Sequence, residues 1–520
     1  MSKKIHLFIT SDTHANWSLN PPSLYQTSHV LKSLQKQHAQ DEVITIDLGD
    51  FIQGTGFATY FSQIEEDGSV FADAMNALNY DYQVIGNHEF NFGLSYLTET
   101  LSQLKSQILC SNILNKETKQ PFMGKPYTII EKNGLKMGLI GATTQYIPNW
   151  EPPQNYEGLV FKDMIEAVGS YIDELRSKVD LLVVAYHGGF EADLETFELT
   201  ELDTGENQGS RLLKEYPEID LLLTGHQHRV INTKVNDTYV IQPGRSGEYI
   251  GHITIDSLGN ITSELVSTID ACMDEELMKE LAPKAQKAQK WLNTSFGVAP
   301  ILIPTEDEGI ARAQGIPFIE LINYIQLQET DADFSAAALI NDGFKSFKGA
   351  ITNEVLLQAY PFFNLIAKVA VTGQDLYDIM EYNYQYYQLD NENQLVVNPT
   401  YKEPKPKHYN RDLFSGLKTV VDMTKPQEQR IIQLIDESTN EPIQRDKLYT
   451  LAVSQYRASG GGNFNTFTPD KLLMITQQDI ATLIPQYIQK MTQNEWDQIN
   501  THYQHVQWTP NVEFSKINDL

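Results

Sequence analysis

The 520-residue sequence predicts a layered α/β domain followed by a mixed α+β domain. In the first half, short apolar runs alternate with amphipathic stretches of helical length, which is typical of strands and helices stacked in layers. A charged, Ala- and Lys-rich stretch at 273–292 separates that half from a less regular remainder. The length also exceeds one ordinary core, because a domain usually holds about 100–200 residues.

The elements of the first domain are expected in a regular order. Continuous Val, Ile and Leu runs are typical of strands buried on both faces. Strands are expected at Ile5–Thr10, Val43–Leu48, Tyr82–Ile85, Lys136–Ile140, Leu181–Ala185, Leu221–Thr224, Val240–Gln242 and Ile250–Ile255. Helices are expected at Ser69–Asn79, Leu94–Leu104, Asp163–Lys178 and Gly209–Tyr216. We place the first domain at residues 1–270 and a linker helix, interrupted by Pro283, at 271–296.

The second domain, at 297–520, is expected to mix helices with strands. Helices are expected at Pro317–Gln328 and Gln374–Tyr387, and strands near Ala367–Val371 and Tyr449–Val453. The Pro- and Lys-rich segment at 401–410 is expected to form a loop.

Composition excludes several classes of protein. The chain carries 39 Lys and Arg against 68 Asp and Glu, a net charge of −29, which disfavours long nucleic acids and anionic membranes. A small phosphate can still bind if metal ions reverse the local field. No apolar run approaches the ~18–20 residues of a membrane span, and no secretory leader is expected at the start. Two cysteines provide no disulfide framework, so we expect a cytoplasmic protein.

Potential metal ligands follow the expected strands at their carboxyl ends, the edge where open α/β sheets bind ligands. They are Asp12 and His14, then Asp50, then Asn87 and His88, then His187, and finally His226 and His228. We assign one metal to Asp12, His14, Asp50 and His228, and a second to Asp50, Asn87, His187 and His226.

The shared carboxylate of Asp50 would hold two metals about 3.5–4 Å apart, the spacing used for phosphate-ester cleavage. Two divalent ions and two aspartates leave the site positive enough for a phosphate. A water at such a pair would lose a proton near neutral pH and attack phosphorus. Each motif alone is more often a turn, a cap or a structural histidine, so the hypothesis rests on the ordered set.

His88 is expected to act on the substrate, because its neighbour Asn87 faces the metal. A histidine there can protonate the departing oxygen or donate to a phosphate oxygen. The alternative is a structural residue at a helix start. The other histidines, which we assign no role, are His6, His29, His38, His252, His408, His502 and His505.

The motifs SDTH, GDF, GNHE, YHGG and GHQH resemble those of the calcineurin-like metallophosphoesterases, and within them the two-domain 5′-nucleotidase family. The resemblance implies an N-terminal four-layer sandwich, with helices flanking two sheets, and a C-terminal α+β substrate-binding domain. It also implies two divalent metal ions, for which histidine and carboxylate ligands suit Mn, Zn, Fe or Co.

Other segments are most similar to one branch, the 2′,3′-cyclic-nucleotide 2′-phosphodiesterase/3′-nucleotidases. They include GDFIQG, QPGRSGEYIG and YRASGGGNF. Classical 5′-nucleotidases carry aspartate beside the catalytic histidine, where this chain has Asn91. Asparagine can orient His88 through its carbonyl oxygen but brings no charge.

In this family the second domain holds the base between two aromatic rings. The resemblance assigns these rings to Phe362, with Tyr360 as an alternative, and to Tyr456. Stacking is worth roughly 1–3 kcal/mol per base and tolerates any base. Asn341 matches a family motif whose arginine is missing here, and Arg457 or Arg411 are candidate substitutes.

We therefore expect a dinuclear-metal hydrolase of small nucleotides that opens 2′,3′-cyclic esters and removes 3′-phosphates. A 5′-nucleotidase or nucleotide-sugar hydrolase is the nearest alternative. A nuclease is disfavoured by the negative charge, and a non-catalytic nucleotide sensor by the complete set of ligands. The sequence does not determine the oligomeric state.

Overall fold

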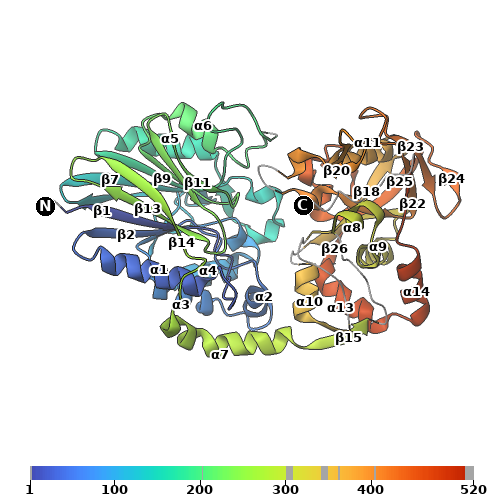
Figure 1. Cartoon of the computed structure of the whole chain (residues 1–520), viewed down its shortest axis with the longest axis horizontal. Helices are drawn as coiled ribbons and strands as arrows, with labels where there is room; N and C mark the ends of the chain where they lie inside the picture. Colours follow the sequence, from blue (N-terminus) through green and yellow to red (C-terminus); the bar gives the residue numbers. More distant parts are fainter. Residues whose placement is uncertain are drawn as a thin grey trace. The chain divides into compact units, whose positions relative to one another are not determined.

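The computed structural model describes residues 3–201, 203–299, 308–340, 349–360, 364–402 and 406–509. The chain divides into two compact units, Met1–Trp291 and Leu292–Leu520. Blue to yellow-green ribbons mark the first unit in Figure 1, and yellow to red ribbons mark the second. The domain limits set from the sequence stay a prediction.

The first unit is built on two mixed sheets. One sheet has the order β14 (Ile261–Ser267), β13 (Tyr249–Ile255), β1 (Ile5–Thr10), β2 (Glu42–Asp47), β3 (Tyr82–Val84) and β4 (Gln107–Leu109). The other has the order β11 (Val230–Val235), β12 (Thr238–Pro243), β10 (Leu221–Thr224), β9 (Leu181–His187), β7 (Leu135–Thr143) and β6 (Tyr127–Lys132).

Three apolar cores hold these sheets in four layers. The central core lies between the sheets and joins side chains such as Leu7 and Ile46 with Val183 and Leu223. The outer face of the first sheet is covered by α1 (Leu24–Gln37), α3 (Ser69–Leu78) and α4 (Leu94–Ser102). The outer face of the second sheet is covered by α5 (Met164–Leu175) and α6 (Gly209–Glu215). The predicted fold class is confirmed.

The expected strands and helices of this unit are present, with ends that shift by up to a few residues. The expected interruption at Pro283 was wrong, because α7 (Glu275–Leu292) continues through it. A proline inside a helix removes one backbone hydrogen bond. Here Leu277, Leu281 and Ala288 are buried in the core that also contains α1, and this packing holds the helix together.

The second unit contains a mixed sheet of order β21 (Asp412–Ser415), β16 (Phe334–Ala338), β25 (Leu448–Ser454), β18 (Leu365–Thr372) and β26 (Leu472–Asp479). This sheet contributes to two apolar cores. One of them contains side chains of α9 (Pro317–Thr330) and α13 (Ile480–Lys490), and the other contains side chains of α11 (Gly373–Asn383). A smaller sheet has the order β24 (Glu441–Pro442), β23 (Ile431–Asp436), β22 (Leu417–Val421) and β27 (Val506–Trp508). Within the described ranges, every helix is too short or too polar to span a membrane.

Candidate metal centre

The predicted ligands lie at the carboxyl ends of parallel strands in both sheets. β1, β2 and β3 run parallel in one sheet, and β7, β9 and β10 run parallel in the other. The loops that follow these strands are backbone-strained. The φ angles are 51° at Asp12, 50° at His14, 60° at Asp50, 68° at His226 and 58° at His228. Left-handed conformations of non-glycine residues cost free energy and concentrate at functional sites.

Two glycines allow the loops after β2 and β3 to approach each other. Gly49 has a φ of 98°, and a Cβ atom there would lie 2.3 Å from the backbone nitrogen of Gly86. A Cβ atom at Gly86 would lie 2.2 Å from Oδ1 of Asp50. Both motif glycines are therefore required to bring Asp50 close to the loop that carries Asn87.

The first cluster contains Asp12, His14 and His228. The Nε2 atoms of His14 and His228 lie 2.9 Å apart. Oδ1 of Asp12 lies 3.4 Å from Nε2 of His228 and 3.8 Å from Nε2 of His14. Three of the four ligands predicted for one metal therefore converge.

The second cluster contains Asp50, His187 and His226, with Asn87 among them. Nε2 of His187 lies 3.2 Å from Oδ2 of Asp50 and 3.0 Å from Oδ1 of Asn87. Nδ1 of His226 lies 2.8 Å from the same Asn87 oxygen. These are the residues predicted for the second metal. Asp50 belongs to this cluster, and its bridging role stays a prediction.

The hydrogen bonds around the clusters show that they suit cations. Nδ1 of His187 donates to the carbonyl oxygen of Leu48 (2.7 Å), and Nδ1 of His14 donates to that of Gln53 (3.1 Å). In the neutral form of each ring, the Nε2 atom is then a lone pair that can bind a metal ion. Oδ2 of Asp50 is buried and makes no hydrogen bond to the described residues. Imidazole nitrogens and carboxylate oxygens that face one another can share a proton or bind a metal cation, and this set of ligand types fits two divalent metal ions.

The electrostatics support the same interpretation. Burial, helped by the neighbouring His228, lowers the pKa of His14 to about 3, so this ring is neutral and can ligate. Burial also lowers the pKa of His187, but the Asp50 carboxylate outweighs it and raises the pKa to about 10. The second cluster therefore attracts positive charge, and a divalent cation supplies more of it than a proton does.

His88 lies beside the clusters at the start of a hydrogen-bonded chain. Its ring centroid is 5.4 Å from that of His14, and its backbone N–H donates to Oδ1 of Asp50 (2.8 Å). Its Nδ1 lies 2.7 Å from Oδ1 of Asn91, whose amide nitrogen donates to Oε1 of Glu151 (2.5 Å). Asn91 thus presents its oxygen to His88, as expected, so Nδ1 carries the proton and Nε2 is left for the substrate.

Three acidic residues near the site had no predicted role. The carboxylate of Glu89 accepts from the backbone N–H groups of Asp50, Phe51 and Gly86, which fixes both metal loops. Oε1 of Glu206 lies 2.9 Å from Nε2 of His226, and Glu151 orients Asn91 as described above. Glu89 belongs to the GNHE motif, whereas no pattern in the sequence distinguished Glu206.

In the second unit, the predicted base-binding segment is partly described. Tyr456 lies in α12 (Gln455–Ala458) and is half-buried, with its ring against Gly461, where a Cβ atom would lie 2.6 Å from the ring. Arg457 is buried, and its guanidinium binds both carboxylate oxygens of Asp412 at 2.8 and 2.9 Å. A substrate contact by Arg457 stays a prediction, and its observed contacts are structural.

The remaining predicted contacts fall on other segments. Asn341 and Phe362 lie outside the described residues. Tyr360, the alternative to Phe362, is only 3% exposed and belongs to an apolar core, so its ring is not available for stacking. Arg411 is likewise buried, with its guanidinium 4.4 Å from the ring centroid of Tyr384.

Comparison with known families agrees with this architecture. Residues 5–230 match the calcineurin-like phosphoesterase family, and residues 302–469 match the 5′-nucleotidase C-terminal domain. The chain belongs to the calcineurin-like metallophosphoesterases with a 5′-nucleotidase C-terminal domain. The resemblance read from the motifs is thereby confirmed, and the protein is a metallophosphoesterase hydrolase.

Several named proteins are similar over most of this chain. The trifunctional nucleotide phosphoesterase protein YfkN of Bacillus subtilis is 24% identical over 93% of this chain, which spans 38% of that protein. A 2′,3′-cyclic-nucleotide 2′-phosphodiesterase/3′-nucleotidase of Haemophilus influenzae is 24% identical, with 87% of this chain and 78% of the relative covered. A human 5′-nucleotidase is 23% identical, with 88% and 82% covered.

Solved structures are similar over both units. A Staphylococcus aureus structure, provisionally named a 5′-nucleotidase and solved in complex with alpha-ketoglutarate, is 29% identical with a TM-score of 0.88. The alignment covers 97% of this chain and 100% of that one. A 5′-nucleotidase precursor from Thermus thermophilus shares the fold, with 19% identity, a TM-score of 0.65, and 98% and 100% coverage.

Proposed function

We propose that this protein is a metal-dependent nucleotide phosphoesterase that opens 2′,3′-cyclic nucleotides and removes 3′-phosphates. The observation that carries the proposal is the pair of acceptor clusters around Asp12 and Asp50, with His88 beside them. Family membership supports the phosphoester chemistry, and several similar proteins bear nucleotide phosphoesterase names.

Metal ions and individual side chains would each have a separate role in the reaction. Two divalent ions, when bound, would polarise the phosphate and activate water. His88 holds one proton on Nδ1 toward Asn91, and in its doubly protonated form it can donate a second proton from Nε2 to the departing ribose oxygen. Asn91, held by Glu151, keeps the His88 ring in one orientation and one tautomer. In the second unit, Tyr456 would stack on the base.

The preference for cyclic and 3′-esters rests on two features of the chain. Asn91 stands where classical 5′-nucleotidases carry aspartate, and YRASGGGNF resembles the cyclic-phosphodiesterase branch. Relatives from Haemophilus influenzae and Salmonella typhimurium carry that branch's name at 24% and 26% identity. The human and rat relatives named 5′-nucleotidase keep a 5′-nucleotidase as the second candidate.

A substrate panel tests the proposal. Manganese-loaded protein should hydrolyse 2′,3′-cyclic AMP and then 3′-AMP faster than 5′-AMP. Asp50→Asn should abolish each of these activities, because it removes a carboxylate from the second cluster. Cleavage of 5′-AMP alone would overturn the preference but keep the phosphoesterase. Turnover that survives Asp50→Asn would overturn the assignment of the site.

A further inference from the structure

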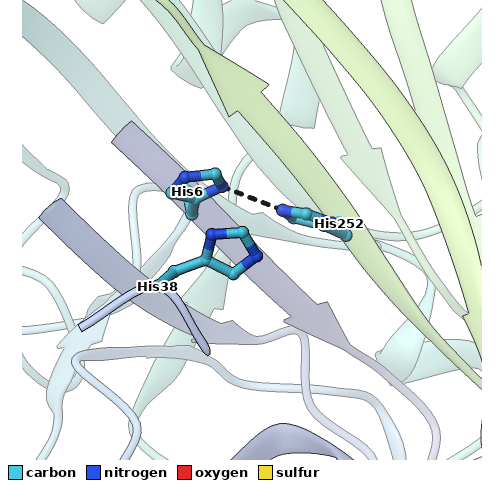
Figure 2. Close-up of side chains that lie close together, drawn as sticks. All are labelled: His6, His38 and His252. Carbon is cyan, nitrogen blue, oxygen red and sulfur yellow. Dashed lines mark hydrogen bonds between the residues drawn. The ribbon is translucent and has the colours of Figure 1, made fainter. Parts of the chain in front are cut away.

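A third cluster of potential ligands lies away from the two clusters described above. It contains His6, His38 and His252, whose ring nitrogens lie within 4.8 Å of one another. Figure 2 shows the three rings converging from β1, from the end of α1 and from β13. His6 lies four residues before Thr10, about 13 Å along β1 from the edge that carries Asp12.

The sheet register explains why these side chains meet. β1 and β13 are antiparallel, with His6 opposite Thr254 and Phe8 opposite His252, so the side chains of all four project from the same face. His38 is the C-cap residue that directly follows α1, and α1 packs over this face. His6 is 3% exposed and His252 is 7% exposed.

Two carboxylates determine the tautomers of the two strand histidines. Nε2 of His6 lies 3.3 Å from Oδ2 of Asp41, and Nδ1 of His252 lies 2.8 Å from Oε1 of Glu264. A carboxylate can only accept, so these two ring nitrogens carry the hydrogens. The other nitrogens, Nδ1 of His6 and Nε2 of His252, are then bare lone pairs only 3.0 Å apart.

The surrounding groups do not supply enough donors for these lone pairs. The hydroxyl of Thr254 lies 3.2 Å from Nδ1 of His6 and 3.3 Å from Nε2 of His252, and its one hydrogen can serve only one of them. Nε2 of His38 is buried without a hydrogen-bond partner in the described part of the chain. Burial lowers the pKa of both His6 and His38, so a proton is a poor occupant.

We propose that His6, His38 and His252 bind one divalent cation of the zinc type, separate from the catalytic pair. Three neutral imidazoles favour zinc, copper, nickel or cobalt over magnesium or calcium. Histidines that ligate metals usually donate their other N–H to a carboxylate, as His6 and His252 do here. The charges of Asp41 and Glu264 would balance a divalent ion.

Such an ion would join three segments that are distant in sequence. β1 and β13 are already paired by backbone hydrogen bonds, whereas His38 lies in the turn between α1 and β2. A ligand from that turn would tie the helical layer to the sheet. The role is structural, because the cluster lies toward the amino end of β1, away from His88.

Metal content of the full-length protein tests the proposal. The protein is stripped with a chelator, saturated with Zn²⁺, freed of loosely bound ions and assayed by mass spectrometry. His38→Gln should bind one zinc ion per chain fewer than the wild type and keep its nucleotide hydrolysis. His29→Gln, a histidine of α1 outside the cluster, is the matched control and should retain the wild-type content.

A second measurement uses only the wild-type protein, so it does not depend on whether a variant folds. Anomalous diffraction at the zinc edge from wild-type crystals should show a peak between Nδ1 of His6 and Nε2 of His252. The proposal would be overturned if that peak were absent. It would also be overturned if the zinc content were unchanged in both His38→Gln and His252→Gln, because the imidazoles would then share only a proton. Because hydrolysis is measured separately, failure of the proposed function would be recognised independently.

Discussion

His88 is the residue whose placement bears most directly on catalysis. Its ring is near His14, and its Nδ1 hydrogen is held by Asn91. General acid catalysis contributes about 10²–10⁴-fold to a rate. We expect His88→Gln to lower kcat by that factor, while metal content and KM change little. Single-turnover kinetics and metal analysis would check this, and an unchanged kcat would contradict the role.

The hydrogen bond between Asn91 and Glu151 can be tested by adding a charge to one residue and then removing the charge from the other. Asn91→Asp should place two carboxylates at hydrogen-bond distance, because the amide nitrogen lies 2.5 Å from Oε1 of Glu151. We expect kcat to fall roughly tenfold, equivalent to about 1.4 kcal/mol. Adding Glu151→Gln should restore most of the loss, because its amide can donate to the new carboxylate.

The double variant is also the internal control for that pair. A general effect of the substitutions on folding would make the double variant worse than either single one. Equal kcat values in N91D and in the double variant would show that Glu151 does not orient this residue. The melting temperature of each variant separates the two outcomes.

Sequence patterns predicted the loops that carry the candidate ligands but not the residues that support them. The five loops could be predicted because each motif follows a buried apolar strand, and parallel strands bring their carboxyl ends to one edge. Glu206 and Glu151 could not be predicted, because they lie in polar loops whose paths the periodicity does not determine. The His6 cluster was missed because β1 and β13 pair in the sheet although they lie far apart in the sequence, and the strand patterns alone do not show this pairing.

Among the helices, the stability of α7 depends on the hydrogen bonds that cap its first turn. Asp274 accepts from the backbone N–H groups of Glu276 (3.0 Å) and Leu277 (3.2 Å). Its other oxygen accepts from Ser28 (2.7 Å) and Lys32 (2.6 Å) of α1. This capping stabilises the first turn of α7, although Pro283 removes a backbone hydrogen bond from the interior of the helix.

Asp274→Ala should therefore destabilise the first unit by about 1–2 kcal/mol, the usual cost of losing an N-cap. Asp274→Asn is the matched control, because asparagine caps as well as aspartate but loses the ion pair with Lys32. Urea unfolding should rank wild type, Asn and Ala in falling order of stability. Equal midpoints for wild type and Asp274→Ala would contradict the capping role.

α7 also shows what the sequence could not specify. Pro283 predicted an interruption, because proline removes a hydrogen bond and clashes with the preceding turn. Packing of Leu277 and Leu281 outweighed that local preference. The helix α1, by contrast, was not predicted because its sequence LYQTSHVLKSLQKQ has few apolar residues, and only contact with the sheet shows which face is buried.

His505 makes the folding stability of the second unit depend on pH. Its Nδ1 lies 2.7 Å from Oε2 of Glu437, and its Nε2 lies 3.1 Å from Oε2 of Glu320. Burial alone would lower its pKa, but the hydrogen bonds to Glu320 and Glu437 raise it to about 9. The charged form is therefore the one that stabilises the fold.

The sign of the effect follows from linkage. The folded pKa lies above the ordinary value of 6.5, so the stabilisation is complete below pH 6.5 and is lost as the pH rises through about 9. Its size is at most about 3 kcal/mol. Denaturant unfolding at pH 6 and pH 9.5 should show this loss, and His505→Gln should reduce it. An equal pH dependence in the variant would contradict the assignment.

The proposed function requires that loops from two sheets hold a pair of divalent cations beside His88. Anomalous scattering from manganese-loaded crystals would show whether both cations are present. We predict one peak within bonding distance of Asp12, His14 and His228, and a second within bonding distance of Asp50, His187 and His226, about 3.5–4 Å apart. Crystals of active protein with no anomalous density at either cluster would show that these residues do not hold the catalytic metals.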